Sequence, residues 1–250
     1  ATTKNGWTPL YLAGIYRQLD AVRLLLAGGS VLHVGDTNGN RFLLEFAVSE
    51  GMENLTEHLL AQGTSPDHKD GRTGSSVLER AVACKHYTVA KILIDHGATV
   101  DRENEIELMM AAVSNSDTRT VELLLDTGAH VNGRDQDGDT LLHLAVRQQD
   151  VGLTQFLLAK GADAGAFNQR GDSPLHEAIR HDLHEIVRAL VLANADVNAG
   201  NRSGTTPLHY AISRDDMDTV SLLINSNIDV NKQDNDGDTP LHTAAMRGNV

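Results

Sequence analysis

Four histidines, His143, His176, His209 and His242, recur every 33 residues, and a regular series of imidazoles could hold metal ions. If they occupy equivalent positions on stacked helices, neighbours stand about 8–10 Å apart. The ligands of a zinc ion all lie about 2 Å from it. Adjacent members of the series therefore cannot share a metal. We interpret each histidine as one that bonds locally and braces its own turn, and we expect no metal site.

Other reactive side chains lack the companions that a catalytic site needs. Cys84 is the single cysteine, and His86 stands two residues further on, which is not a catalytic signature. The pairs His176-Glu177 and His184-Glu185 lack the second histidine of a zinc protease motif. No phosphate-binding loop or dinucleotide fingerprint is present. We therefore expect no catalytic residues, no cofactor and no enzyme activity.

The composition limits the classes of partner. The chain has 21 Lys and Arg against 34 Asp and Glu, a formal net charge of −13. A field of this sign repels phosphate backbones and anionic lipids, so we expect no nucleic-acid partner. No apolar run approaches the roughly 18 residues of a membrane-spanning helix, so we expect no membrane insertion. One cysteine cannot form a disulfide within the chain, and we expect an intracellular location, cytoplasmic or nuclear.

The histidines belong to a repeated phrase, Thr-Pro-Leu-His-x-Ala. A marker alanine closes each copy, full or weak: Ala13, Ala47, Ala81, Ala111, Ala145, Ala178, Ala211 and Ala244. A second marker follows 16 residues later, or 17 in the case of Gly128: Gly29, Gly63, Gly97, Gly128, Gly161, Asn194 and Asn227. Two independent markers in one register indicate a tandem repeat.

Each repeat predicts a pair of helices. A Thr or Ser before Pro is a helix N-cap followed by a first-turn proline. A polar break such as Arg214-Asp215-Asp216 separates the first helix from a second one, which ends at the Gly or Asn marker in the left-handed conformation. A polar turn containing glycine then leads to the next unit. Such a pair cannot bury its apolar face alone, so neighbouring units must stack.

These residues resemble the ankyrin-repeat family, which has the same phrase and a period of about 33 residues. The resemblance implies an all-α solenoid with short β-hairpin fingers, and a single ankyrin-repeat domain over residues 1–250. We expect seven full repeats and a truncated eighth, approximately 5–37, 38–70, 71–102, 103–136, 137–169, 170–202, 203–235 and 236–250.

The unit at 103–136 departs from the pattern. The interval between Gly97 and Leu108 is short, which predicts a shortened finger, and Asn115-Ser116-Asp117 is expected to add a residue between the helices. This unit is either a local irregularity or a boundary between two blocks. The chain opens without an initiator Met and stops where a further helix should begin, so we expect a monomeric segment of a longer protein.

In the family, partners lie along the concave side and touch finger tips and the first helices. Positions two and three after the marker alanine carry an arginine in each of the last four units. The candidate partner-binding residues there are Arg147, Arg180, His181, Arg214 and Arg247, with the finger acids Asp139 and Asp172 beside them. The alternative is that the arginines only keep the helices soluble. Tyr16 is a further candidate contact, or else packs against a preceding repeat.

Asn132, Asn198 and Asn231 close the Val-Asn of their repeats and resemble asparagines that are hydroxylated in ankyrin proteins, so we hypothesise hydroxylation there. The function that the resemblance implies is a non-catalytic scaffold that binds a partner protein or peptide along the concave groove. The alternative is a regulatory or targeting segment of a larger enzyme, channel or effector protein.

Overall fold

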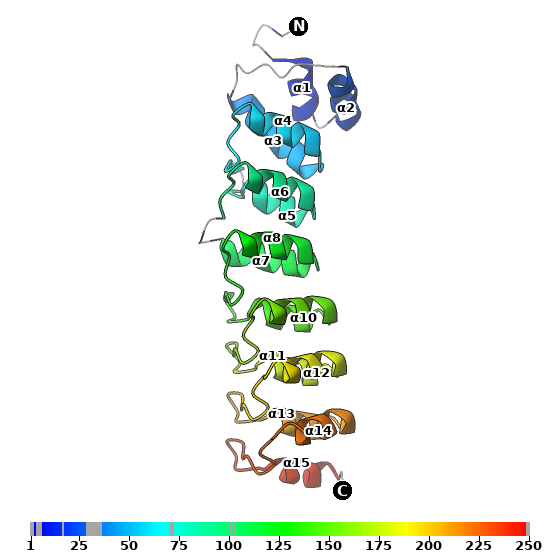
Figure 1. Ribbon diagram of the computed structural model, residues 1–250, viewed down its shortest axis with the longest axis vertical. Coiled ribbons are helices and arrows are strands. Elements are labelled where there is room, and N and C mark those ends of the chain that lie inside the picture. Colours follow the sequence, from blue (N-terminus) through cyan, green and yellow to red (C-terminus); the bar gives the residue numbers. More distant parts are fainter. Residues whose placement is uncertain are drawn as a thin grey trace. The chain divides into compact units, whose positions relative to one another are not determined.

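The computed structural model describes residues 3, 7–16, 18–28, 37–70, 73–100, 102 and 104–248. They fall into two compact units, Ala1–Asp101 and Arg102–Val250, and we treat each unit by itself. The division falls at the start of the irregular unit. Each compact unit is built from stacked helix pairs, as the all-α solenoid prediction requires (Figure 1).

The described residues of the first unit form three helix pairs. The helices are α1 (Pro9–Ile15), α2 (Leu19–Ala27), α3 (Thr37–Ser49), α4 (Glu53–Ala61), α5 (Val77–Ala83) and α6 (Tyr87–Asp95). The two helices of each pair contact each other, and α3 contacts both α1 and α5. The first helices of the pairs thus form one row.

In the second unit, the part that the structure describes contains four pairs and one further helix. The helices are α7 (Glu105–Ser114), α8 (Thr118–Asp126), α9 (Leu141–Arg147), α10 (Val151–Ala159), α11 (Pro174–Arg180), α12 (His184–Leu192), α13 (Pro207–Ser213), α14 (Met217–Ile224) and α15 (Pro240–Arg247). The first helices α7, α9, α11, α13 and α15 contact one another in turn. The segments that link successive pairs lie together on one side of the helices (left in Figure 1).

The helix starts confirm the predicted caps. The hydroxyl of Thr140 accepts a hydrogen bond from the backbone N–H of His143, and Ser173 does the same for His176. These contacts satisfy N–H groups that the first turn of a helix leaves without a partner. Proline occupies the first helical position of α1, α11, α13 and α15.

The second helices end in the left-handed conformation, as predicted. Positive φ angles between 60° and 98° occur at Gly63, Gly97, Gly128, Gly161, Asn194 and Asn227, whereas Gly29 lies outside the described residues. The first helices end in the same way, which the sequence analysis did not anticipate. A third marker, with φ between 52° and 71°, comprises Gly51, Lys85, Ser116, Gln149, Asp182, Asp215 and Gly248.

The hydrogen bonds correct the register of the irregular unit. The N–H of Asp117 donates to the carbonyl of Ala112, as the N–H of Asp150 donates to that of Ala145. The marker alanine of this unit is therefore Ala112, and the turn after α7 has the same length as the turn after α9. The prediction of an added residue between the helices was wrong, because two adjacent alanines hid the true register.

The marker alanines of the first helices are buried. Ala47, Ala81, Ala112, Ala145, Ala178 and Ala211 are all inaccessible to solvent. A small side chain lets neighbouring helix backbones approach closely, and the leucines around it fill the remaining space. Because each helix packs only on its neighbours, every unit depends on the units beside it.

The predicted fingers are tight turns with little strand pairing. Isolated antiparallel bridges join Lys69 to Ser76 and Arg134 to Thr140. In the second unit a side-chain Oδ1 closes each turn by accepting from the N–H groups two and four residues further on. This role falls to Asp135, Asn168, Asn201 and Asp234. The turns thus place the residue before each N-cap in a fixed position.

Successive finger turns also bond to each other. The N–H of Gln169 donates to the carbonyl of Asp137, and the N–H of Asn235 donates to that of Ser203. Gly171 lies in this stack with φ at 77°, and a Cβ added to it would lie 2.5 Å from the backbone nitrogen of Arg202. Glycine at this position therefore permits the close approach of two fingers.

Among the described residues, no helix has both the length and the apolar character needed to cross a membrane.

We predict that Gly171→Ala destabilises the protein more than Gly161→Ala. Both glycines have left-handed φ angles, so each alanine should cost about 1 kcal/mol. An added Cβ at Gly161 meets nothing within 4 Å, whereas the one at Gly171 meets the Arg202 backbone. Overpacking there should cost about a further 1–3 kcal/mol. Urea unfolding of the two variants measures the difference, and equal losses would contradict the close stacking of the fingers.

Candidate functional site

The repeated histidines brace their own turns, as predicted, and they also reach the next repeat. The Nδ1 atom of His143 accepts from the backbone N–H of Thr140 at 3.2 Å. Its Nε2 lies 3.1 Å from the carbonyl oxygen of Asp172 in the following finger. Because a carbonyl only accepts, Nε2 carries the proton and donates. Each such histidine thus ties the start of one helix to the next turn.

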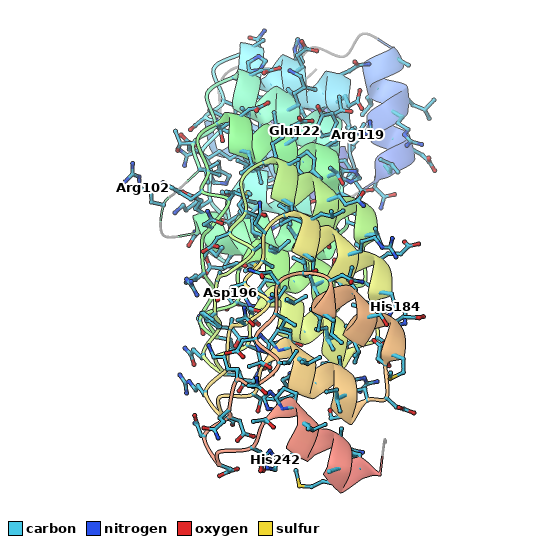
Figure 2. The ribbon with its side chains drawn as sticks, turned by 60° about the horizontal axis from the view of Figure 1, so that its bottom comes forward. Arg102, Arg119, Glu122, His184, Asp196 and His242 are labelled. Atoms are coloured by element: carbon cyan, nitrogen blue, oxygen red, sulfur yellow. The ribbon has the colours of Figure 1, made fainter. Side chains whose placement is uncertain are left out.

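The same pair of bonds recurs along the second unit. His176 bonds to Ser173 and to the carbonyl of Thr205, and His209 bonds to Thr206 and to the carbonyl of Asp238. His242 in α15 makes the bonds within its turn but is exposed (Figure 2).

Burial keeps the two best-enclosed imidazoles neutral. It lowers the pKa of His143 and of His176 below the ordinary value of 6.5, although hydrogen bonds to carbonyls act in the opposite direction. A neutral imidazole is what the bonding pattern requires, because Nδ1 must accept. The histidines are therefore structural ties, and His143 holds Asp172 by its backbone at the candidate site.

Two buried aspartates before the N-caps form ion pairs with partly exposed arginines of the first helices. The Asp139 carboxylate accepts from Arg147 Nη2 at 2.5 Å, and the Asp172 carboxylate accepts from Arg180 Nη2 at 2.7 Å. The aspartate side chains are 5% and 3% exposed, whereas the arginines are 40% and 30% exposed. The carboxylates thus lie beneath the guanidinium groups.

The next finger supplies the second bond to each carboxylate. Asn168 Nδ2 donates to Asp139 at 2.9 Å, and Asn201 Nδ2 donates to Asp172 at 3.0 Å. Burial raises the pKa of both aspartates, but these hydrogen bonds and the arginine charges outweigh it and hold the pKa below its ordinary value. Both carboxylates therefore stay ionised at neutral pH.

Cationic side chains from two neighbouring repeats surround the carboxylate of Glu177 in α11. Its buried carboxylate lies 2.6 Å from Nη2 of Arg170, which belongs to the preceding finger. Arg147 from α9 approaches to 3.8 Å, and Arg180 approaches to 3.7 Å. The Nε2 atom of His181 lies 3.6 Å away. We call Glu177 and these four side chains the Glu177 cluster.

Tyr210 of α13 extends the cluster toward the next repeat. Its hydroxyl accepts from Arg180 Nη2 at 2.8 Å and from Asn201 Nδ2 at 3.2 Å. The Arg180 guanidinium also lies 5.2 Å from the centre of the Tyr210 ring, and His176 packs edge-on against the same ring. These contacts fix the direction in which Arg180 points.

The structure brings together only some of the residues chosen from the sequence. Arg147, Arg180 and His181 meet in the Glu177 cluster. Asp139 and Asp172 are buried beneath the arginines, so they hold those side chains and offer no free surface to a partner. Arg214 points elsewhere, because it forms a two-pronged ion pair with Asp182 of the preceding inter-helix turn.

The remaining two candidates belong to other elements than the Glu177 cluster does. Arg247 ends α15 and is exposed. Tyr16 belongs to the first compact unit, where it follows α1 with 70% of its surface exposed. Their roles as partner contacts stay predictions.

Sequence reasoning missed Glu177, Arg170 and Tyr210. Glu177 and Tyr210 occupy the variable position of the repeated phrase, between the histidine and the marker alanine. A charged residue directly before the marker alanine of a short buried helix could have drawn attention to Glu177. No signal in the sequence connects Arg170 with it, because the bond depends on the path of the finger.

Two of the three asparagines proposed for hydroxylation bond to the linking segment of the next repeat. Oδ1 of Asn132 accepts from the N–H of Asp163, and Oδ1 of Asn198 accepts from that of Asp229. Asn231 is exposed. Asp196, at the same position of its repeat as Asp163 and Asp229, lies among these linking segments, away from His184 at the start of α12 (Figure 2). Hydroxylation stays a prediction.

In the part of the chain that the structure describes, no group of three or more His, Cys, Asp or Glu side chains is arranged to hold a metal ion. The chemistry that the Glu177 cluster offers is recognition by charge and hydrogen bonds.

We predict that Arg180→Ser lowers the free energy of unfolding by about 2 kcal/mol, because it removes a charged hydrogen bond from a buried carboxylate. The next repeat has Thr205 and Ser213 where this one has Asp172 and Arg180. Adding Asp172→Thr should therefore recover part of the loss, with a coupling of about 1 kcal/mol.

The matched control is Arg214→Ser, whose ion pair with Asp182 is exposed on both sides and should cost less than about 1 kcal/mol. Urea unfolding is measured for the wild type, for Arg180→Ser, for Asp172→Thr, for the double variant and for the control Arg214→Ser. The first four proteins form a double-mutant cycle. Additive losses for Asp172→Thr and Arg180→Ser would show that the pair does not act as one unit.

Comparison with known proteins identifies the family of this chain. Residues 108–201 and 185–250 match the family model of ankyrin repeats in three copies, and residues 5–36 match that of a single ankyrin repeat. The chain is 33% identical over 130 residues to an L-asparaginase of Dirofilaria immitis, which covers 51% of this chain and 22% of the relative.

Two further relatives are named as a nuclear factor subunit and as a potassium channel. The nuclear factor NF-kappa-B p105 subunit of Gallus gallus is 30% identical over 144 residues, 55% of this chain and 14% of that protein. The potassium channel AKT2/3 of Arabidopsis thaliana is 29% identical over 134 residues, 52% of this chain and 16% of the channel. The chain thus spans less than a quarter of each of these three relatives. Since matches to one family model extend from residue 108 to residue 250, more than half of its length, the chain belongs to the ankyrin-repeat family.

Proposed function

We propose that this chain is a non-catalytic module that binds a protein or peptide partner. Its partner lies along the face of the second unit formed by α9, α11, α13 and the finger turns that precede them. We call this the first-helix face. Ankyrin repeats generally mediate protein–protein interaction, which supports the class of function.

The observation that supports this face is the layering of its charges. Asp139, Asp172 and Glu177 are buried, while the side chains of Arg147 and Arg170 that bind them are 40% and 60% exposed. Arginine side chains held in place by buried acids have less freedom to lose when they bind, which favours recognition. Arginines that served only for solubility would not need such support.

A second candidate function is regulation or targeting within a larger protein. It is favoured by the relatives named as an enzyme and as a channel, of which this chain matches a small part. In that case the occupant of the first-helix face belongs to the same longer protein. We further propose that the module is monomeric and intracellular, where the free and exposed thiol of Cys84 would stay reduced.

Hydrogen exchange on a captured complex tests the proposed face. The 250-residue chain serves as bait, the bound protein is identified by mass spectrometry, and the complex is reconstituted. We expect slower amide exchange in residues 134–148, 167–181 and 200–214, because a partner would cover these segments. Exchange in the second helices α10, α12 and α14 should stay unchanged and provides the internal control.

Protection confined to the second helices would contradict the proposed face. A bound protein that contacts only residues 1–101 would contradict it as well. Under the regulatory alternative, the same segments become protected when the chain is joined to the rest of its longer protein.

A further inference from the structure

The Glu177 cluster presents positive charge outward in a protein whose formal net charge is −13. The side chains of Asp139, Asp172 and Glu177 are between 2% and 5% exposed, and their carboxylates already accept hydrogen bonds. The arginines that bind them reach the surface. A partner that approaches this face therefore meets guanidinium groups before it meets any of the three acids.

We infer that the partner of the first-helix face is an acidic segment whose carboxylates pair with Arg147 and Arg170. This inference rests on the proposed function and specifies the chemistry of the partner.

The hydrogen-bonding capacity of the two arginines supports this chemistry. A guanidinium carries five N–H donors in a rigid fork that matches a carboxylate. The short bond from Arg147 to Asp139 and the short bond from Arg170 to Glu177 each use one Nη2 group. The side chains are 40% and 60% exposed, and each guanidinium has donors beyond the one in its short bond, so we expect it to bind a second carboxylate.

A basic partner fits this face poorly. A lysine or arginine of the partner would have to displace Arg147 or Arg170 before it reached Asp139 or Glu177. Breaking an ion pair whose acid is buried costs more than an exposed ion pair returns. The charge of the chain as a whole attracts basic proteins, but it does so through exposed acids outside the Glu177 cluster, such as Asp137 of the finger before α9.

Glu177 acts as a positioning residue in this arrangement. It holds Arg170 directly and lies within 4 Å of Arg147 and Arg180. Cations from two adjacent repeats are thus kept at one place, although like charges repel. Without a buried anion between them, these guanidinium groups would repel one another and move apart.

Selection from a random peptide library tests the inference. The wild-type chain is used to select binding peptides from a displayed library, and the enriched pool is sequenced. We expect enrichment of Asp and Glu at two or more positions. The best peptide, labelled with a fluorophore, is then titrated with the wild type and with variants, and its anisotropy gives the Kd.

The variants follow substitutions that the chain itself contains. Ser203 occupies the position of Arg170 one repeat later, and Ser213 occupies that of Arg180. Arg170→Ser should weaken the acidic peptide about tenfold, which corresponds to the loss of one charged contact. Arg188→Ser removes the same charge from an exposed position of α12 and should change the Kd less than about twofold. Thermal melting checks that both variants fold.

The outcomes separate the inference from the proposed function. A pool enriched in basic or uncharged peptides, or an acidic peptide that binds Arg170→Ser as tightly as the wild type, overturns the inference and leaves peptide binding intact. A selection that enriches no peptide overturns both. Acidic enrichment, with Arg170→Ser weakened and Arg188→Ser unaffected, supports the assignment.

Discussion

Hydrogen bonds from imidazoles enclosed in the first helices to the next repeat fix the fingers between α9 and α15 of the second unit. His143 holds the N–H at the start of its own helix with Nδ1 and the carbonyl of Asp172 with Nε2. Helix packing alone fixes the distance between repeats but leaves the finger free to shift along the stack. A directed bond from each of His143, His176 and His209 fixes the following finger, and with it the residue that precedes the next helix. The regular series of histidines could suggest a metal site in the sequence, but in the structure these side chains form hydrogen bonds between successive repeats.

The candidate site follows from this constraint. Because the backbone of Asp172 is held by the preceding histidine, its carboxylate lies where Arg180 and Asn201 can both reach it. Bonds from α9, from α11 and from the finger before α13 converge on this one residue. The cations of the Glu177 cluster are therefore positioned by neighbouring repeats together, so that the surface exists only when the repeats are stacked. Such dependence is expected of a repeat protein, in which each unit is stable through its interfaces.

Much of the fold could be predicted from the sequence, and the site only in part. Thr-Pro and the Gly or Asn markers report local backbone requirements, so they revealed the helix starts and ends without knowledge of distant contacts. The register at Ala112 was missed because Ala111 is also an alanine, and only the bond from Asp117 distinguishes them. Arg147 and Arg180 were found by their place in the repeat. The aspartates that pair with them were predicted to bind a partner, whereas Asp139 and Asp172 are buried. The contact between Arg170 and Glu177 depends on the path of the finger, which leaves no pattern in the sequence.

The most direct test of the account is the protonation state of the tied histidines, measured by two-bond ¹H–¹⁵N correlation spectra of the imidazoles across a pH titration. We predict that His143 and His176 carry their proton on Nε2 and titrate below 6.5, because burial lowers the pKa of both. With folded pKa values below the unfolded ones, their contribution to stability is full above about pH 6.5 and declines as the pH falls through that value. An Nδ1–H tautomer, or titration at the value of a free imidazole, would contradict the proposal that these histidines tie one repeat to the next.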